Sequence, residues 1–156
     1  NAQAKILSSP GIVRNESICR ELLKEPQIST TLDVAKKADI ALVGIGRLTD
    51  NSILSRPDGI LTGADITFLK SRGAIGDISL RFFDSQGQCI QGRINNRVVG
   101  LTMDELISIP RVVGIAGGRE KFLPVLAALK NKLINILITD KWLAEKLLKE
   151  RIKEKP

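Results

Sequence analysis

The sequence predicts a three-layer α/β fold built on a mostly parallel, Rossmann-like sheet. Apolar strand-like runs alternate with helical patterns, and the joints between them are short. The core must also be aliphatic, because 43% of the residues are hydrophobic while the chain has four Phe, one Trp and no Tyr. Buried parallel strands covered by helices use such Ile-, Leu- and Val-rich runs. At 156 residues the chain has the length of one domain or a large part of one.

The first part of the chain predicts two strands with two helices between them. The helical spacing of the first helix stops before Pro26. The second helix leads almost directly into a continuous apolar run. The expected elements are a strand at Ala4–Leu7, a helix from Asn15 or Glu16 to Lys24, a helix capped by Ser29 and running to about Lys37, and a strand at Asp39–Gly44 (DIALVG).

The middle of the chain predicts a long polar loop, 46–63, followed by short elements. Asp84–Gly87 has the composition of a hairpin turn. Thr102 and Glu105 have capping-box spacing at the start of a short helix. The expected elements are a helix at Ala64–Ser71, a strand at Gly76–Phe83, antiparallel pieces at Cys89–Ile90 and Arg97–Val99, and a helix from Thr102 to Ile107.

The last part of the chain predicts a strand–helix–strand–helix series. Its elements are a strand at Arg111–Ala116, a helix at Arg119–Lys132, a strand at Ile134–Thr139, and a final amphipathic helix capped by Thr139 or Asp140. Crossovers between parallel strands are right-handed by default. Ligands of such sheets bind beyond the carboxyl ends of the strands, which is where we expect a site.

The composition excludes several classes of site. The chain contains no His, which removes the Ser-His-Asp triad and the commonest metal ligand. Cys19 and Cys89 form no ligand-spaced cluster, so we expect reduced thiols rather than a zinc site. No cofactor or metal is expected. The sequence shows no 18-residue apolar run and no secretory signal, so it predicts a cytoplasmic protein with no membrane segment.

The formal net charge of +7 raises the question of direct nucleic-acid binding. Residues 141–156 contain six Lys or Arg and three Glu, so nearly half of the excess lies in the final helix and its tail. Cations near a helix C-terminus complement its dipole. Since no basic face with interleaved aromatics and no helix-turn-helix is evident, a solvated surface with a basic tail is the favoured interpretation.

The stretch RVVGIAGGREKFLPVLAAL, residues 111–129, ends an apolar strand at Gly117 and Gly118 and then starts a helix. Arg119 and Lys121 follow, although cations are disfavoured at a helix N-terminus. One hypothesis is an anion site, in which the glycines admit a phosphate or carboxylate that offsets the cations. The alternative is a tight βα turn whose cations extend into water. The stretch matches neither a P-loop nor a dinucleotide fingerprint.

Four further residues can likewise be interpreted either as ligand-binding or as purely structural. Asp77 stands between a glycine turn and an apolar strand, where it could accept hydrogen bonds from ligand hydroxyls or from nearby loop N–H groups. Gly44 and Gly46 would leave room for a ligand or would simply turn sharply. Arg47 has the spacing to pair with Asp50, which we favour over pairing with an anion.

Taken together, the motifs resemble the effector-binding domain of SorC-type (SorC/DeoR-like) sugar-responsive transcriptional regulators. The resemblance covers most of the chain and rests on pieces that occur in order at family-like spacing. These are SSPGIV at 8–13, ADIALVGIG at 38–46, GAIGDISLRFFDSQG at 73–87, and IPRVVGIAGGREKFLPVLAALKNKLINILITDKWLAEKLL at 109–148.

The resemblance implies a fold like that of sugar-phosphate isomerases and glucosamine-phosphate deaminases, and a phosphorylated sugar bound at the carboxyl edge of the sheet. By motif, Asp77 looks like the acid that contacts sugar hydroxyls, Lys121 like the ligand-binding lysine, and Gly44 and Gly46 like the strand end that lines the crevice. Gly117 and Gly118 complete the expected ligand site. Residues 1–156 would then be part of an effector domain.

The resemblance also implies a homo-oligomer, a dimer or a tetramer, that binds operator DNA through an N-terminal helix-turn-helix outside this chain. The family's glycine-rich phosphate loop likewise lies outside the matched pieces. Two alternatives remain open. One is a sugar-phosphate isomerase or deaminase with Asp77 or Asp50 as base, and the other is a structural oligomerisation module.

Overall fold

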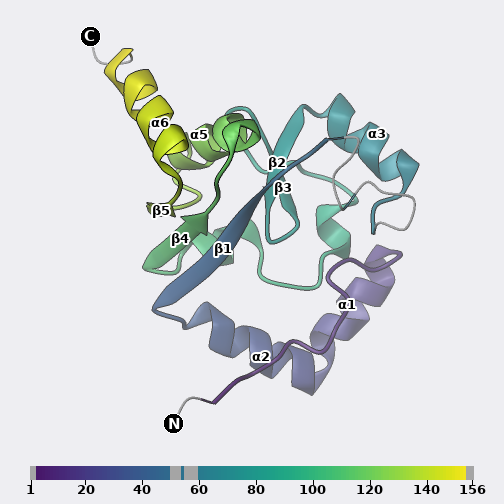
Figure 1. Ribbon diagram of the computed structural model, residues 1–156. Helices are drawn as coiled ribbons and strands as arrows, with labels where there is room; N and C mark the ends of the chain where they lie inside the picture. Colours follow the sequence, from purple (N-terminus) through teal and green to yellow (C-terminus); the bar gives the residue numbers. More distant parts are fainter. Residues whose placement is uncertain (1–2, 50–53, 55–59, 154–156) are drawn as a thin grey trace.

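The computed structural model describes residues 3–49, 54 and 60–153. Their strands form a five-stranded sheet of order β3-β2-β1-β4-β5 (Figure 1). The strands are β1 (Ile40–Arg47), β2 (Ala74–Ile78), β3 (Arg81–Asp84), β4 (Arg111–Ile115) and β5 (Ile136–Ile138). Strands β1, β4 and β5 pair in parallel, and β2 is antiparallel to both of its neighbours. Since only β2 is reversed, the predicted α/β fold with a mostly parallel sheet is confirmed.

Helices pack on both sides of this sheet, but unevenly. The helices are α1 (Glu16–Lys24), α2 (Pro26–Lys36), α3 (Gly63–Ser71), α4 (Met103–Ile107), α5 (Phe122–Lys130) and α6 (Lys141–Lys153). Val43, Ile45 and Val112 point to one side, where α4, α5 and α6 bury Leu106, Val125, Leu143 and their neighbours in the main core. We call this side the α5 face. On the other side α3 packs over β2 and β3, burying Leu69 against Phe82.

The first helices form a separate small core away from the sheet. Cys19 of α1 and Ile28 and Leu32 of α2 pack with Val13 and Val99. Asn15 caps α1 by accepting the Ile18 N–H at 3.0 Å. Cys19 is buried, and both cysteines are free thiols, as expected. The residues described contain no helix long and apolar enough to cross a membrane.

Two predictions for the first part of the chain are wrong. Ala4–Leu7 forms no strand, because its backbone finds no neighbouring strand to pair with among the described residues, although Leu7 packs partly against the small core. The second helix begins at Pro26 rather than after Ser29. Proline at the first helical position has its φ preset and lacks only an N–H that would have no intrahelical partner. Ser29 instead lies inside the helix, where its hydroxyl donates to the Pro26 carbonyl at 3.3 Å.

The predicted single strand Gly76–Phe83 is also wrong, because it contains a hairpin turn. Ser79 and Leu80 have φ values of 51° and 65°, and they reverse the chain between β2 and β3. Such left-handed pairs form the tight turns that match strand twist, usually with Asn or Gly. No glycine marks this turn, and the Asp77 carboxylate supports it by accepting the Leu80 N–H at 3.2 Å. The predicted turn at Asp84–Gly87 is confirmed, with Gly87 N–H donating to Asp84 O at 2.9 Å.

Other predicted elements are present in the structure, but several of them begin or end at different residues. The capping box of Thr102 and Glu105 is present at α4. Strand β1 runs on to Arg47, so Gly46 lies in a strand and not in a loop. The predicted helix at Arg119–Lys132 starts with a 3₁₀ turn, η3 (Arg119–Lys121), and α5 ends at Lys130. The predicted strand Ile134–Thr139 shortens to β5, and just before it the Asn135 side chain accepts the Val112 N–H at 2.9 Å.

Candidate functional site

A cavity of about 1050 Å³ opens at the carboxyl ends of β1, β4 and β5, where parallel α/β sheets bind ligands. It lies at the edge of the sheet, where Gly44, Ile115 and Ile138 line it together with Ile45 and Ala116 of the main core. Of the residues expected to bind ligand, the structure brings together at this cavity Gly44, Gly46, Asp77, Gly117 and Lys121. Gly118 is not among its lining residues. Residues of β1, β2, β4, β5 and η3, or of the turns that follow them, therefore converge here.

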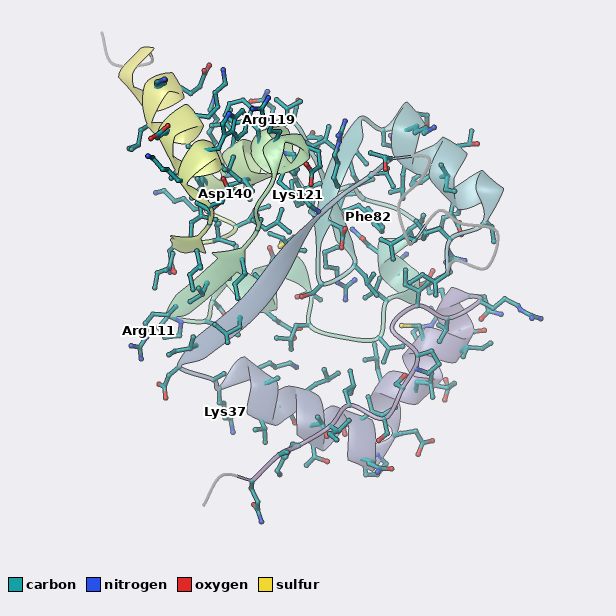
Figure 2. The ribbon with its side chains drawn as sticks, viewed as in Figure 1. Lys37, Phe82, Arg111, Arg119, Lys121 and Asp140 are labelled. Carbon is teal, nitrogen blue, oxygen red and sulfur yellow. The ribbon has the colours of Figure 1, made fainter. Side chains whose placement is uncertain are left out.

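Lys121 supplies a positive charge to the cavity. It ends the 3₁₀ turn η3, and its side chain extends back to β1 (Figure 2). There its Nζ donates to the Ile45 carbonyl at 3.0 Å. A lysine ammonium has three N–H donors, so this bond holds the group in place and leaves donors for a ligand.

Arg119 lies only two residues away but has a different environment. Its guanidinium stacks over the Trp142 ring at 5.3 Å from the centroid, and it is not among the cavity lining. Such a contact stabilises an exposed cation by about 0.5–1 kcal/mol. Of the two cations after the glycine pair, one therefore faces the cavity and the other packs on α6.

Asp77 supplies a partly buried carboxylate to the same cavity. It is the register partner of Gly46 in the β1–β2 ladder. Burial raises the pKa of Asp77, and the Leu80 N–H bond and the nearby Lys121 charge only partly oppose this. An acid held in this way accepts or donates hydrogen bonds depending on its protonation, and ligand hydroxyls can do both.

The glycine pair is held by Asp140, which follows β5. Its Oδ2 accepts the Gly118 N–H at 2.6 Å, while its Oδ1 accepts the Leu143 N–H at 2.9 Å and so caps α6. These backbone donors lower the pKa of Asp140. A Cβ on Gly117 would lie 2.9 Å from Oδ2, and Gly118 has a φ of 97°, so neither position accepts a side chain without a shift or strain.

Asp140 is a cavity residue that the sequence interpretation did not include in the site. The sequence predicted it only as a possible helix cap, and capping gave no signal that its second oxygen would reach the glycine turn. Glu120 and Arg47 also line the cavity, and Leu54, Leu80, Ile115 and Ile138 add apolar wall. Asp50, the expected partner of Arg47, lies outside the described residues. This mixture of charged, hydrogen-bonding and apolar groups suits a small polar ligand.

Comparison with known proteins identifies the family. Residues 1–149 match the family model Sugar-bind, described as "Putative sugar-binding domain". The chain belongs to this family. Its curated relatives include the transcriptional regulator LsrR of Escherichia coli K12, with 34% identity over 146 residues, covering 92% of this chain and 46% of LsrR. The sugar-binding domain described here thus spans about half the length of that regulator.

Solved structures give the same assignment. The sugar-binding domain of a transcriptional repressor from Vibrio fischeri matches with a TM-score of 0.83 and 33% identity, covering 92% of this chain and 57% of that one. The full-length sorbitol operon regulator SorC from Klebsiella pneumoniae matches with a TM-score of 0.76 and 27% identity, covering 89% of this chain and 44% of SorC. The resemblance to SorC-type regulators is confirmed.

Proposed function

We propose that this domain is the sensing part of a transcriptional regulator and that its effector is a phosphorylated sugar. One observation carries the proposal. The ammonium of Lys121 and the carboxylate of Asp77 belong to one cavity at the carboxyl ends of parallel strands. A ligand with an anionic group at one end and hydroxyls at the other matches this pair of charges, and a sugar phosphate is such a ligand.

The roles follow from the donors and acceptors at each position. Lys121 meets the phosphate with the N–H groups that Ile45 does not use. Asp77 accepts a hydroxyl hydrogen, because its carboxylate already accepts one backbone N–H and has further lone pairs. Gly44 allows the ligand to approach the backbone closely, because nothing lies within 4 Å of a Cβ at this position. Gly46 and Gly117 instead make room for the carboxylates of Asp77 and Asp140.

In the complete regulator, the bound sugar changes operator affinity through a separate helix-turn-helix domain and through the packing of subunits in a homo-oligomer. Linkage requires that the ligand binds one arrangement of subunits more tightly than the other. The domain performs no catalysis in this proposal. The homologues support that view, since the matched proteins are named as regulators.

The test is a thermal-shift panel that pairs five- and six-carbon sugar phosphates with their unphosphorylated parents. It is run on a protein that contains this domain together with the family's glycine-rich phosphate loop. A ligand present at about 100 times its dissociation constant stabilises the fold by about 2.7 kcal/mol, which raises the Tm of a domain of this size by several degrees. We expect at least one sugar phosphate to do so while its parent sugar does not. Stabilisation by none of them at millimolar concentration contradicts the proposal.

The same panel separates the alternatives. Chromatography of each mixture after prolonged incubation detects conversion of the sugar phosphate, which would replace the sensor by an isomerase or deaminase. Sedimentation with and without ligand tests the coupling to subunit packing. An oligomer that forms equally well in both conditions, with no thermal shift from any ligand, would indicate a structural module.

A further inference from the structure

A second cavity, of about 560 Å³, opens between the α1–α2 pair and the segment that runs from β3 to α4. Both cysteines of the chain line it, so we call it the thiol cavity. Its apolar and sulfur-containing wall consists of Cys19, Leu23, Leu32, Cys89, Val98 and Met103. No described residue lines both this cavity and the one that contains Lys121. The two are therefore separate sites.

Asn95, which lines the thiol cavity, has an acceptor without a partner. Its Oδ1 is buried and accepts no hydrogen bond from any described residue. The amide is held in this orientation because its Nδ2 donates to Cys89 Sγ at 3.1 Å and to the Ile90 carbonyl. Buried acceptors are nearly always satisfied, since leaving one without a partner destabilises the fold. A molecule bound here is thus expected to bring an N–H or O–H group.

Arg81 presents a flat surface to the cavity and few free donors. A guanidinium has five N–H groups in one plane, and backbone carbonyls take most of those of Arg81. The carbonyls are those of Leu101 at 2.9 Å, Asn95 at 2.6 Å, Val98 at 3.4 Å and Gly100 at 3.1 Å. With its edges occupied, such a group contacts a ligand through its face, on which aromatic rings stack. The thioether of Met103 also favours aromatic contacts.

The charged groups around the thiol cavity already have partners. Lys36 lies 3.0 Å from Glu105 and 3.5 Å from Asp33. Arg20 lies 3.4 Å from Glu16. A charged ligand would have to compete with these pairs, whereas a neutral ligand leaves them intact. The lining therefore favours an uncharged molecule.

We propose that the thiol cavity is a second binding site, for a neutral nitrogen heterocycle of the nucleobase or nicotinamide type. A ring N–H or amino group of the ligand donates to Asn95 Oδ1, and the ring packs against Arg81 and Met103. A polyol has the donors but no flat face, and an organic acid adds an unpaired charge. The volume of about 560 Å³ is within the range of small-molecule sites.

The first test is a thermal-shift series on the larger protein of the sugar panel, with no sugar present. The probes are uracil, adenine and nicotinamide, each paired with its fully N-methylated derivative, and ribitol represents the polyols. At ten times its dissociation constant, we expect at least one parent heterocycle to raise the Tm by at least about 3 °C. Its methylated derivative should give no shift, because it has no N–H for Asn95 Oδ1.

Three results of this series overturn the proposal. They are the absence of a shift from every heterocycle, an equal shift from a parent and its methylated derivative, and a shift from ribitol alone. Since the series contains no sugar phosphate, its failure leaves the proposed effector site untouched, and the sugar panel tests that site separately.

The second test locates the ligand through Cys89, a half-buried free thiol in the cavity wall. Burial raises the pKa of Cys89, so alkylation by iodoacetamide is followed at about pH 8.5, with peptide mass spectrometry to separate Cys89 from other thiols. At ten times its dissociation constant, the ligand should slow alkylation of Cys89 about tenfold. An unchanged rate means that the heterocycle binds elsewhere and overturns the proposal.

The third test closes the cavity with a bulky side chain. Ser29 of α2 lines the cavity, so Ser29→Trp should abolish both the thermal shift and the protection of Cys89. Thr30→Trp is the matched control, because Thr30 is the next residue of α2, is exposed and is not among the lining residues. If Ser29→Trp loses the circular dichroism of the wild type, Gln91→Trp replaces it, since Gln91 is an exposed lining residue on the opposite wall. Equal binding by the cavity variant and by Thr30→Trp overturns the proposal.

Discussion

The carboxylate of Asp77 occupies the space that a side chain on Gly46 would need. A Cβ built on Gly46 would lie 1.8 Å from Oδ1 and 2.8 Å from Cγ of Asp77. The two residues are partners in the β1–β2 ladder, so glycine at this position allows the acid to lie flat against β1. There the carboxylate shares the cavity with Lys121. Glycine 46 thus determines where the acid of the candidate site stands.

Gly46→Ala should therefore displace Asp77 from its place. Overpacking of a filled site costs about 1–3 kcal/mol, so we expect a lower Tm with the fold retained. Loss of the Asp77 contact should weaken the best sugar phosphate of the panel about tenfold, measured by titration calorimetry. Gly44→Ala is the control for stability, because nothing lies within 4 Å of a Cβ at Gly44. If both variants have the Tm of the wild type, the close approach of Asp77 to Gly46 has no energetic effect.

Lys121→Ala should weaken phosphorylated ligands far more than their parent sugars, since the lost group is the cation that faces the cavity. A charge-assisted hydrogen bond contributes about 1.5–3 kcal/mol, which corresponds to roughly a 10- to 150-fold change in the dissociation constant. Arg119→Ala removes the same formal charge two residues away, but its guanidinium packs on Trp142. Both variants are titrated with one sugar phosphate and its parent sugar. An equal loss of affinity for the sugar phosphate in the two variants would contradict the prediction, because the net charge of the loop and not Lys121 would then determine binding.

Asp77→Asn should stabilise the protein at neutral pH. Burial raises the native pKa of Asp77 above its unfolded value near 3.9, so between these two pKa values the native state binds more protons than the unfolded state. The contribution of Asp77 to stability is therefore fully present below the unfolded pKa and is lost as pH rises through the native pKa. Urea unfolding from pH 4 to 8 should show this decline in the wild type and not in the Asn variant. If the free energy of unfolding has the same pH dependence in both proteins, the raised native pKa of Asp77 is contradicted.

Arg81→Met should destabilise the fold strongly, because the Arg81 guanidinium organises the loop after β3. It donates to the carbonyls of Asn95, Gly100 and Leu101 at 2.6, 3.1 and 2.9 Å, and the residue is 6% exposed. Each buried carbonyl left without a partner costs about 1–3 kcal/mol, so we expect a loss of about 3 kcal/mol or more in urea unfolding. Arg20→Met, on the exposed surface of α1, should change stability by less than about 0.5 kcal/mol. A similar small effect at Arg81 would mean that water replaces its hydrogen bonds.

Much of the fold followed from local patterns in the sequence. The apolar run of β4, the capping box of α4 and the helical spacing of α1 are each specified by a few neighbouring residues, and each was predicted close to its observed position. The hairpin at Ser79-Leu80 could not be predicted this way. Its support comes from the Asp77 carboxylate, and no glycine or asparagine announces the left-handed backbone.

The sequence by itself determined the class of the fold, the family, and the glycine and charged residues at the ends of the strands. The fold class follows from composition, periodicity and spacing along the chain, and the family follows from the resemblance of its motifs to those of known regulators. Only the tertiary structure decided that Lys121 faces the cavity while Arg119 stacks on Trp142, and that Asp140 joins the glycine turn to α6. The direction of a long side chain depends on which partner lies within its reach, and those partners, Ile45 and Trp142, are distant in sequence or on another element. The exposure of Leu42 and Ile138 is likewise visible only in three dimensions, because exposure depends on which elements pack against a strand and not on the residues within it.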